Sequence, residues 1–185
     1  CPCEGLRQPR IFDRARPHFP GAFAPSPLGD IPEGWNVRRL SDIADILSGG
    51  TPRKSNPSFW NGQLPWVSPK SMSSIHVSDT EQHVTEEAVG SGTKEVAAGA
   101  SFIMVRGMGL HDGVRISQAR CRSTFNQDVK AIVPREIDPA LLLFVLLDAQ
   151  TSLHKRVRSS GHVTGVLPTD AIGELQVALP PSNVA

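Results

Sequence analysis

The side chains that could do chemistry in this chain are cations, hydroxyls and amides, not paired acids. Metal-assisted hydrolysis would need clustered carboxylates with a lysine. The acids are scattered, and Glu81, Glu86, Glu87 and Glu95 fall in a polar stretch that we expect to be looped. There is no Gly-x-Ser-x-Gly nucleophile turn and no Asn/Asp-Pro-Pro-aromatic methyltransferase motif. We therefore expect no intrinsic catalysis, and polar groups that bind rather than react.

The run from Gly49 to Lys54, GGTPRK, places a hydroxyl and two cations on a turn. It lacks the Gly-Lys-Ser/Thr ending of a nucleotide phosphate loop, so we do not expect nucleotide binding. Such a turn can instead present Thr51, Arg53 and Lys54 to a DNA backbone. The alternative is an ordinary solvated turn.

Two tryptophans and a polar loop follow that turn. Trp60 and Trp66 are interpreted as core anchors, because duplex DNA offers no free base faces for stacking. Ser68 and Lys70 come directly after the short apolar run that ends at Val67. We expect them to contact phosphates or base edges, and the alternative is plain surface decoration.

The stretch from Arg106 to Lys130 is rich in cations, with only Asp112 and Asp128 as acids. Its alternating strand-like segments would form a basic sheet surface suited to a phosphate track. The competing interpretation is a strand edge protected by charge. The cations are Arg106, Arg115, Arg120, Arg122 and Lys130.

A further basic cluster occupies residues 154–162, with no carboxylate between Asp148 and Asp170. Its charges therefore look uncompensated, and nearby serines add hydroxyl donors. DNA contact is one interpretation; the other is a solvated helix end, where cations favour the negative terminus. The cluster comprises His154, Lys155, Arg156, Arg158, Ser159, Ser160 and His162.

The elements that must position these groups are short strands with a few helices. We expect a strand or turn over Trp35–Leu40, then a short helix capped by Ser41 that buries Ile43, Ile46 and Leu47. Gly49-Gly50-Thr51-Pro52 must end that helix. Further strands are expected over residues 64–67, 99–106, 114–116, 129–133 and 175–179.

The strongest helix signal is Asp138-Pro139, an N-cap followed by proline at the first helical position. We expect a mostly buried helix with Leu141, Phe144 and Val145 inside, then a second turn through Leu153 and Val157 that stops at Ser159-Ser160-Gly161. Thr169 is expected to cap a last single turn. Short polar loops between the strands favour an α+β fold with a twisted antiparallel or mixed sheet.

Composition sets broad limits. The 185 residues suffice for one domain with a core, and 39% hydrophobic residues exclude a disordered chain. The net charge of +1 is a weak signal for nucleic acid, so any DNA surface must be local. No apolar run approaches a membrane helix and no signal-peptide core is present, so we expect a cytoplasmic chain with reduced thiols and no membrane contact. Three cysteines make a poor zinc set.

Several short segments occur in a recognisable order: Ile31-Pro32-Glu33-Gly34-Trp35, Gly49-Gly50-Thr51-Pro52, Leu64-Pro65-Trp66-Val67-Ser68-Pro69-Lys70, Asn126-Gln127-Asp128 and Leu179-Pro180-Pro181. In that order they resemble one target recognition domain of a type I restriction-modification specificity subunit. The loop over residues 159–167 resembles the Gly- and Ser-rich loop that precedes the family's last short helix.

The resemblance implies a non-catalytic reader of double-stranded DNA. Family members pair two recognition domains through long helices that dock methyltransferase subunits. Those subunits methylate adenine with S-adenosylmethionine, and separate restriction subunits use ATP and Mg²⁺ to cut DNA. We therefore expect no cofactor in this chain itself. The partners expected are duplex DNA, methyltransferase and restriction subunits, and a second specificity half.

Asn126 and Gln127 carry amides that match adenine N6 and N7. The same segment recurs in the family whichever sequence is read, so we favour a structural or backbone-contact role for them. The complete predicted DNA-contacting set is Thr51, Arg53, Lys54, Ser68, Lys70, Arg106, Arg115, Asn126, Gln127, Lys130, Lys155, Arg156, Arg158, Ser160 and His162.

The chain departs from the full family pattern, with one recognition domain and no long heptad-bearing helix. We expect a proline-rich lead-in over residues 1–28, a recognition domain over 29–181, and the start of a following conserved helix over 182–185. A fragment, a truncated gene product and a half-subunit are all compatible with this. The alternative function is a protein-interaction module, derived from the same family, that does not bind DNA.

Overall fold

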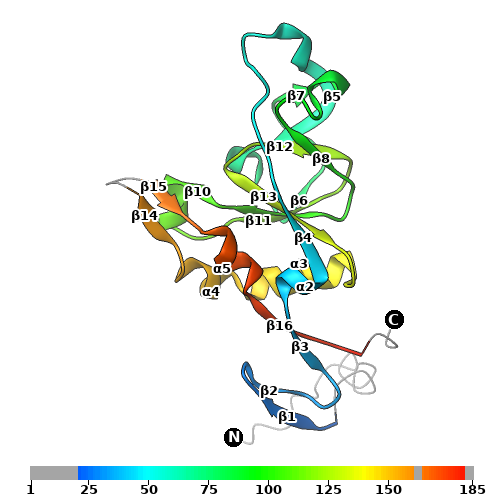
Figure 1. Ribbon diagram of the computed structural model, residues 1–185, viewed down its shortest axis with the longest axis vertical. Helices are drawn as coiled ribbons and strands as arrows, with labels where there is room; N and C mark the ends of the chain where they lie inside the picture. The colour runs from blue at the N-terminus through cyan, green and yellow to red at the C-terminus, as the bar shows by residue number, and fades with distance from the viewer. Residues whose placement is uncertain (1–20, 161–163, 182–185) are drawn as a thin grey trace, which may run out of the picture. The chain divides into compact units, whose positions relative to one another are not determined.

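The computed structural model describes residues 21–160 and 164–181 (Figure 1). The chain forms two units: unit 1 comprises Cys1–Arg38 and Gln176–Ala185, and unit 2 comprises Arg39–Leu175. The predicted start of the recognition domain, at residue 29, falls inside a hairpin of unit 1. The limits 29–181 stay a prediction.

Unit 1 contains two strand pairs. β1 (Phe23–Ser26) and β2 (Gly29–Pro32) form an antiparallel hairpin, and β3 (Asn36–Arg39) pairs with β16 (Gln176–Leu179). β1 lies inside the proline-rich lead-in expected over residues 1–28. The Ser26 hydroxyl closes the hairpin by donating to Gly29 O at 2.6 Å. Phe23 is 61% exposed. The strands predicted near Trp35 and over 175–179 are confirmed as β3 and β16.

The main sheet of unit 2 has the strand order β4-β13-β9-β11-β6. All neighbours are antiparallel except β11 and β6, which are parallel, so the expected mixed sheet and α+β class are confirmed. Its core side chains include Phe102, Ile103 and Ile132, all fully buried. The strands are β4 (Ala44–Ser48), β6 (His76–Val77), β9 (Ser101–Met104), β11 (Ile116–Ala119) and β13 (Val129–Pro134).

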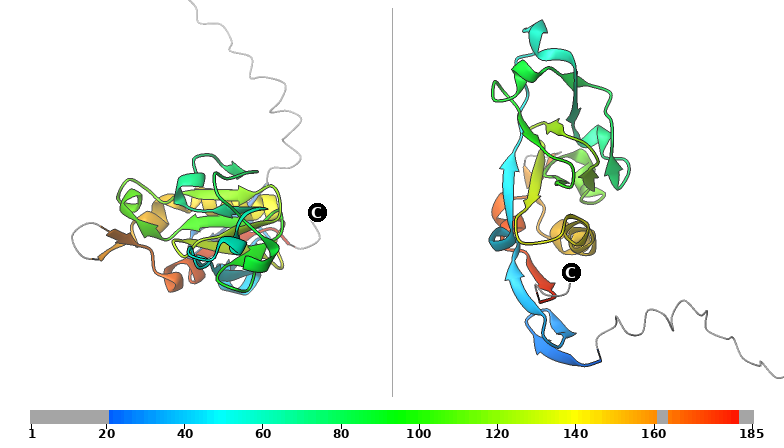
Figure 2. Two further views of the ribbon diagram at one scale, coloured as in Figure 1. Left: turned by 90° about the horizontal axis from the view of Figure 1, so that it is seen from above. Right: turned by 90° about the vertical axis from the view of Figure 1, so that its right-hand side faces the viewer.

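Two smaller sheets complete the strands of unit 2. The first has the order β7-β5-β12-β8, in which β5 and β12 run parallel, and its Phe125 ring lies 5.6 Å from that of Phe102 in the main sheet. The second has the order β10-β15-β14, and its β14–β15 hairpin projects from one side of unit 2 (Figure 2). The strands are β5 (Trp60–Val67), β7 (His83–Val84), β8 (Lys94–Val96), β12 (Ser123–Phe125), β10 (Arg106–Gly107), β14 (Arg158–Ser160) and β15 (Thr164–Val166).

The helices of unit 2 are short apart from α3 (Pro139–Asp148), which packs on β9 and β11. Asp138 caps it as predicted, its Oδ1 accepting from the amides of Ala140 and Leu141 at 2.8 and 3.0 Å. The remaining helices are α2 (Leu40–Ile43), α4 (Gln150–His154) and α5 (Thr169–Gly173), with 3-10 turns η2 (Pro57–Phe59), η3 (Pro69–Ser71), η4 (Glu86–Ala88) and η5 (Met108–His111).

The buried face of α3 differs from the expected one. Leu142, Leu143 and Leu146 are its buried residues, whereas Phe144 is 68% exposed. Because the helix is apolar all round, the sequence period cannot select a face. Leu141 and Val145, also expected inside, are half-buried.

Other local expectations are also wrong. The helix expected to run from Ser41 to Leu47 stops at Ile43 without a side-chain cap, because Ala44–Ser48 pair with β13 as a strand. The strand expected over 114–116 begins only at Ile116. Residues 158–160 form β14 rather than a helix stop, and Thr169 is the first residue of α5, not its cap.

Candidate nucleic-acid interface

The Gly49–Pro52 turn is enclosed by two backbone segments and the indole of Trp66. Gly50 N donates to Phe125 O at 2.9 Å, and Trp66 Nε1 donates to Gly50 O at 3.1 Å. A Cβ at Gly50 would lie 2.1 Å from Gly92 O, and one at Gly49 would lie 2.3 Å from Asn126 O. Glycine is therefore needed at both positions for close backbone approach. The turn is a fixed support for Arg53 and Lys54, which are both exposed.

The amides of Asn126 and Gln127 are already engaged inside the protein. Asn126, only 6% exposed, accepts from Asp128 N at 3.0 Å and donates to Asp128 Oδ2 at 3.4 Å. Gln127 accepts from Thr51 Oγ1 at 2.5 Å and donates to the same Asp128 oxygen at 3.4 Å. These bonds tie the Gly49–Pro52 turn to the loop after β12, which fits the structural role we favoured. DNA contact by Thr51, Asn126 or Gln127 stays a prediction.

Three predicted contacts meet in one polar depression of about 580 Å³, which we call the central hollow. Lys54 comes from the turn after β4, and Ser68 and Lys70 come from the loop after β5. The capping box of η3, with Ser68 as N-cap, fixes that loop. Segments far apart in sequence thus place two ammonium groups and a hydroxyl around the same space.

The opposite wall of the central hollow is the loop Asp79–Gln82, which sequence reasoning did not select. Thr80 Oγ1 donates to Gln82 O at 2.6 Å, and Trp66 N donates both to Thr80 Oγ1 and to Gln82 O at 3.0 Å. The backbone N–H of Thr80 and the side chain of His83 hold the pKa of Asp79 below its usual range. The sequence signal was Asp79-Thr80, a pair that favours a local side-chain turn.

Two further hollows adjoin the central one. The outer hollow, about 610 Å³, shares Lys54, Glu81 and Gln82 with it and reaches Trp60. The inner hollow, about 420 Å³, shares Ser73 with the central one and is lined by Arg115. Arg115 Nη1 donates to Pro69 O at 3.0 Å, next to Lys70.

The three hollows therefore form a continuous run along unit 2, with cations in each. Lys54 belongs to the outer and central hollows, Lys70 to the central and Arg115 to the inner one.

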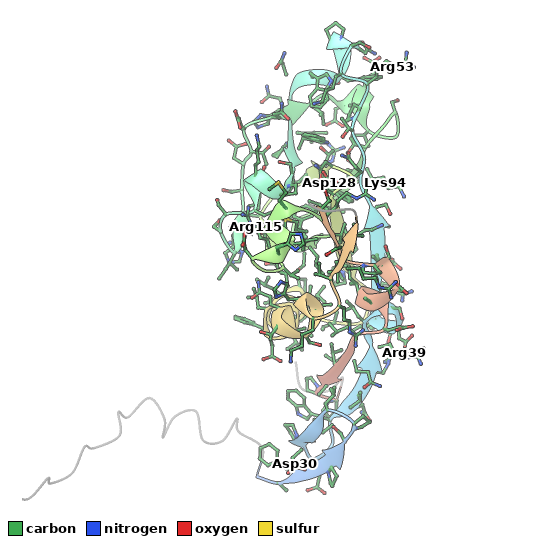
Figure 3. All side chains as sticks on the ribbon, turned by 90° about the vertical axis from the view of Figure 1, so that its left-hand side faces the viewer. Asp30, Arg39, Arg53, Lys94, Arg115 and Asp128 are labelled. Atoms are coloured by element: carbon green, nitrogen blue, oxygen red, sulfur yellow. The ribbon has the colours of Figure 1, made fainter. Side chains whose placement is uncertain are left out.

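The tryptophans act as the expected core anchors beside these hollows. Trp66 is 6% exposed and belongs to a buried apolar cluster with Leu64 and Val84, against which Trp60 packs. The two indoles meet edge to face with centroids 5.3 Å apart. Trp60 Nε1 also donates to Arg53 O at 3.3 Å, so it supports the segment whose Arg53 lies at one end of unit 2 (Figure 3).

The cations of 106–130 do not form one basic face. In Figure 3, Arg115 lies toward one edge of unit 2 and Lys94, whose charge acts on Lys130, lies toward the opposite edge. Arg122 is neutralised, with its Nη1 2.6 Å from Glu86 Oε1 and its Nε 2.7 Å from Glu95 Oε2. This contact lowers the pKa of Glu86 and raises that of Arg122. The sequence could not show this, because both acids come from an earlier segment.

Lys130 lies beside a cation that sequence reasoning missed. Its Nζ donates to Ser48 Oγ at 2.5 Å, across the β13–β4 register. Burial lowers the pKa of Lys130, and the positive charge of Lys94 lowers it further. Lys94, exposed on β8, was absent from the predicted set.

The late basic cluster is not uncompensated in space. Lys155, Arg156 and Arg158 line a hollow of about 290 Å³ together with Asp170 and Glu174, which α5 and the residue after it supply. Arg156 Nη1 also donates to Ala171 O at 3.1 Å. The alternative of a solvated helix end is wrong for Arg158, which lies in β14.

Arg106 in β10 and Arg158 in β14 lie on either side of Val166 in the central strand β15. Both are register partners of Val166, and both are exposed. Directly paired residues point to the same face, so the two guanidinium groups extend from one side of this sheet, about 10 Å apart at the backbone. Ser160 is also in β14, but its side chain is not described, and His162 lies outside the described residues.

A family model described as the type I restriction modification DNA specificity domain matches residues 32–184. The chain belongs to this family. Among curated relatives, the EcoR124I/EcoR124II specificity subunit of Escherichia coli is 40% identical over 101 residues, covering 54% of this chain and 25% of the relative. The MjaIX specificity subunit of Methanocaldococcus jannaschii is 24% identical over 162 residues, covering 85% and 37%.

Solved structures have the same fold as this specificity domain. The HsdS subunit of Thermoanaerobacter tengcongensis matches with a TM-score of 0.62 at 20% identity, over 86% of this chain and 36% of that one. A chain from a structure of type I R-M complex assembly and conformational transition matches with a TM-score of 0.65 at 20% identity, over 93% and 40%. The chain spans between a quarter and two-fifths of the length of these four proteins.

No three His, Cys, Asp or Glu side chains among the described residues gather closely enough to hold a metal ion. None of the described helices has the length and apolar character needed to cross a membrane. Cys121 is a free thiol whose Sγ donates to Ser78 O at 3.2 Å.

Proposed function

We propose that this chain recognises duplex DNA in a sequence-specific manner, as all or part of the specificity subunit of a type I restriction-modification system. The observation that carries the proposal is the run of three hollows, in which Lys54, Lys70 and Arg115 accompany polar side chains such as Gln82. The relatives named as specificity subunits support the same function.

In this function the cations bind phosphates and fix the register of the protein on the duplex. Polar side chains between them reach base edges, which alone carry sequence information. The net charge of +1 gives little long-range attraction, so affinity comes from these local contacts. The chain acts as a reader without catalysis and needs no cofactor.

The reactions belong to partners in this proposal. Methyltransferase subunits bind S-adenosylmethionine and methylate adenine, and restriction subunits use ATP and Mg²⁺. A second specificity half, on the same or another polypeptide, reads the other half of the target.

The test is a titration of the full chain against a mixed-sequence duplex over a range of salt concentrations. The wild type should bind with an affinity that falls as salt rises, because each phosphate contact contributes about 0.9 to the slope of log K against log salt. Replacing Lys54, Lys70 and Arg115 by alanine should reduce that slope by about 2.7. Arg39→Ala is the control, since Arg39 is exposed at the other end of unit 2 from Arg53 (Figure 3).

A wild-type chain without salt-sensitive binding would reject the proposal in favour of a protein-interaction module. If the triple variant keeps the wild-type slope, the interface lies elsewhere on the molecule.

A further inference from the structure

A side-chain amide reads adenine with its oxygen and nitrogen together, because N6 needs an acceptor and N7 needs a donor. The amides of Asn126 and Gln127 are each held by internal bonds at both ends, which fix their orientation toward the protein. Gln118 and Gln150 donate to backbone carbonyls. These four side-chain amides are therefore already hydrogen-bonded within the folded chain.

Gln82 is placed differently. Its residue is exposed, and its amide makes no hydrogen bond to the part of the chain that the structure describes. It lines both the central and the outer hollow. Asn61 lines only the outer hollow, and Gln63 lines neither.

The backbone under Gln82 is rigidly held. Its carbonyl accepts from Thr80 Oγ1 and from Trp66 N, and the adjacent His83 Nε2 lies 2.7 Å from Asp79 Oδ1. Trp66 itself is buried in the apolar cluster. With the backbone fixed, the ordering cost on binding is confined to the side-chain rotamers of Gln82, about 0.5–1.5 kcal/mol.

Two cations share the hollows that Gln82 lines. Lys54 borders the same two hollows as Gln82, and Lys70 borders the central one, together with the acids Asp79 and Glu81. Two ammonium groups held on phosphates would fix the register of the duplex and bring base edges within reach of a polar side chain in the same hollow.

We propose that Gln82 is a base-reading residue of this chain, and that its amide bonds N6 and N7 of one adenine in the major groove. The inference rests on the proposed DNA-binding function and assigns one position of the target. Loss of such a paired contact reduces discrimination against other bases by about 5- to 150-fold.

The experiment selects bound duplexes from a pool with randomised central positions, using the full chain, Gln82→Ala and Gln63→Ala. The wild type and the Gln63 control should enrich a common sequence that contains the adenine. Gln82→Ala should lose the preference at that one position and keep the others, with an unchanged salt slope. Because the Gln82 side chain makes no internal bond, the variant should melt like the wild type.

A second arm uses the selected duplex with 7-deazaadenine at the assigned position, which removes the N7 acceptor. This change should weaken wild-type binding but leave binding by Gln82→Ala unaltered. Equal weakening of both proteins, or an unchanged sequence preference in Gln82→Ala, would overturn the assignment.

Salt-sensitive binding by the wild type without any enriched sequence would also overturn the assignment. It would leave the phosphate contacts of the proposed function in place. The absence of salt-sensitive binding altogether would instead reject the proposed function.

Discussion

Whether a polar side chain is available for a ligand depends on the hydrogen bonds it already makes, and this decides between residues of the same type. Gln127 and Gln82 carry identical amides, yet one is bonded to Thr51 and Asp128 while the other faces two hollows unbonded. The same reasoning separates the arginines. Arg122 is held by two glutamates, whereas Arg106 is exposed beside Val166.

The first prediction concerns Lys130, whose pKa is lowered by burial and by the charge of Lys94. Lys94→Gln removes the like charge and should raise the pKa of Lys130 toward its ordinary value of 10.5. A carbon-13 NMR titration of the lysine side-chain methylenes measures this directly. Lys70→Gln is the matched control, because Lys70 is not a cause of the shift, and an unmoved pKa in Lys94→Gln would contradict the prediction.

The same shift affects stability in a defined direction. Burial and Lys94 disfavour the charged form of Lys130 in the folded state, so this charge lowers the free energy of unfolding by its full amount below the folded pKa. The destabilisation decreases as pH rises from the folded pKa of Lys130 toward its unfolded pKa. The contribution of Lys130 to the free energy of unfolding should therefore increase across this alkaline window, and less so in Lys94→Gln.

At the residue scale, the sequence predicted candidate side chains on loops that glycine or proline residues indicate. It missed the side chains whose role depends on tertiary contacts. Lys54 follows the Gly49–Pro52 turn and Lys70 follows Pro69, so their exposure was expected, whereas Ser68 precedes Pro69 and is half-buried. Gln82 follows the turn signal Asp79-Thr80 and Lys94 follows Gly90-Ser91-Gly92, but both gain significance only from neighbours distant in sequence. Glu86 and Glu95 were expected in a loop, but their pairing with Arg122 is a tertiary contact that no local pattern encodes.

At the element scale, the Gly49–Pro52 turn supports the outer and central hollows, because Lys54 follows it directly. Gly50→Ala would put a methyl group 2.1 Å from Gly92 O, against backbone that cannot rotate away. We expect this change to lower the free energy of unfolding by about 2–3 kcal/mol, at the upper range for overpacking. It should also weaken duplex binding, since displacement of the turn moves Lys54.

Urea denaturation monitored by tryptophan fluorescence measures the effect of Gly50→Ala, since Trp66 bonds Gly50 O. Gly21→Ala is the control: nothing lies within 4 Å of its added methyl, and we expect a change within about 0.5 kcal/mol. Equal stability of the two variants would show that the turn is not tightly enclosed.

The elements that the sequence predicted well have strong local signals. The Asp138-Pro139 start of α3 and the alternating strand β13 are examples, since a cap and a period of two are read without tertiary information. The strand β4 was mistaken for helix because its pairing with β13 overrides local propensity. The exposed Phe144 face was missed because an all-apolar helix has no preferred side.

At the scale of the whole molecule, the proposed DNA-binding surface offers few phosphate contacts. The run of hollows supplies three cations, and the chain spans between a quarter and two-fifths of the relatives' length. Three contacts predict a fall in affinity of about 40-fold between 50 and 200 mM salt. Weak binding by a single chain is therefore the expected state, and strong binding needs a second reader.

This leads to the last prediction. Two copies of the chain, joined by a Gly/Ser linker that spans two sites on one duplex, should bind about 10²- to 10⁴-fold more tightly than one copy, because the second contact becomes intramolecular. The control joins the wild type to a copy with Lys54→Ala and Lys70→Ala, which keeps the mass and the linker but removes both ammonium groups of the central hollow. Equal affinity of the two fusions would mean that these hollows do not carry binding, whereas a gain confined to the wild-type pair assigns the second contact to the same surface as the first. Fluorescence anisotropy at one fixed salt concentration makes the comparison, because a change of salt would alter the affinity of both fusions.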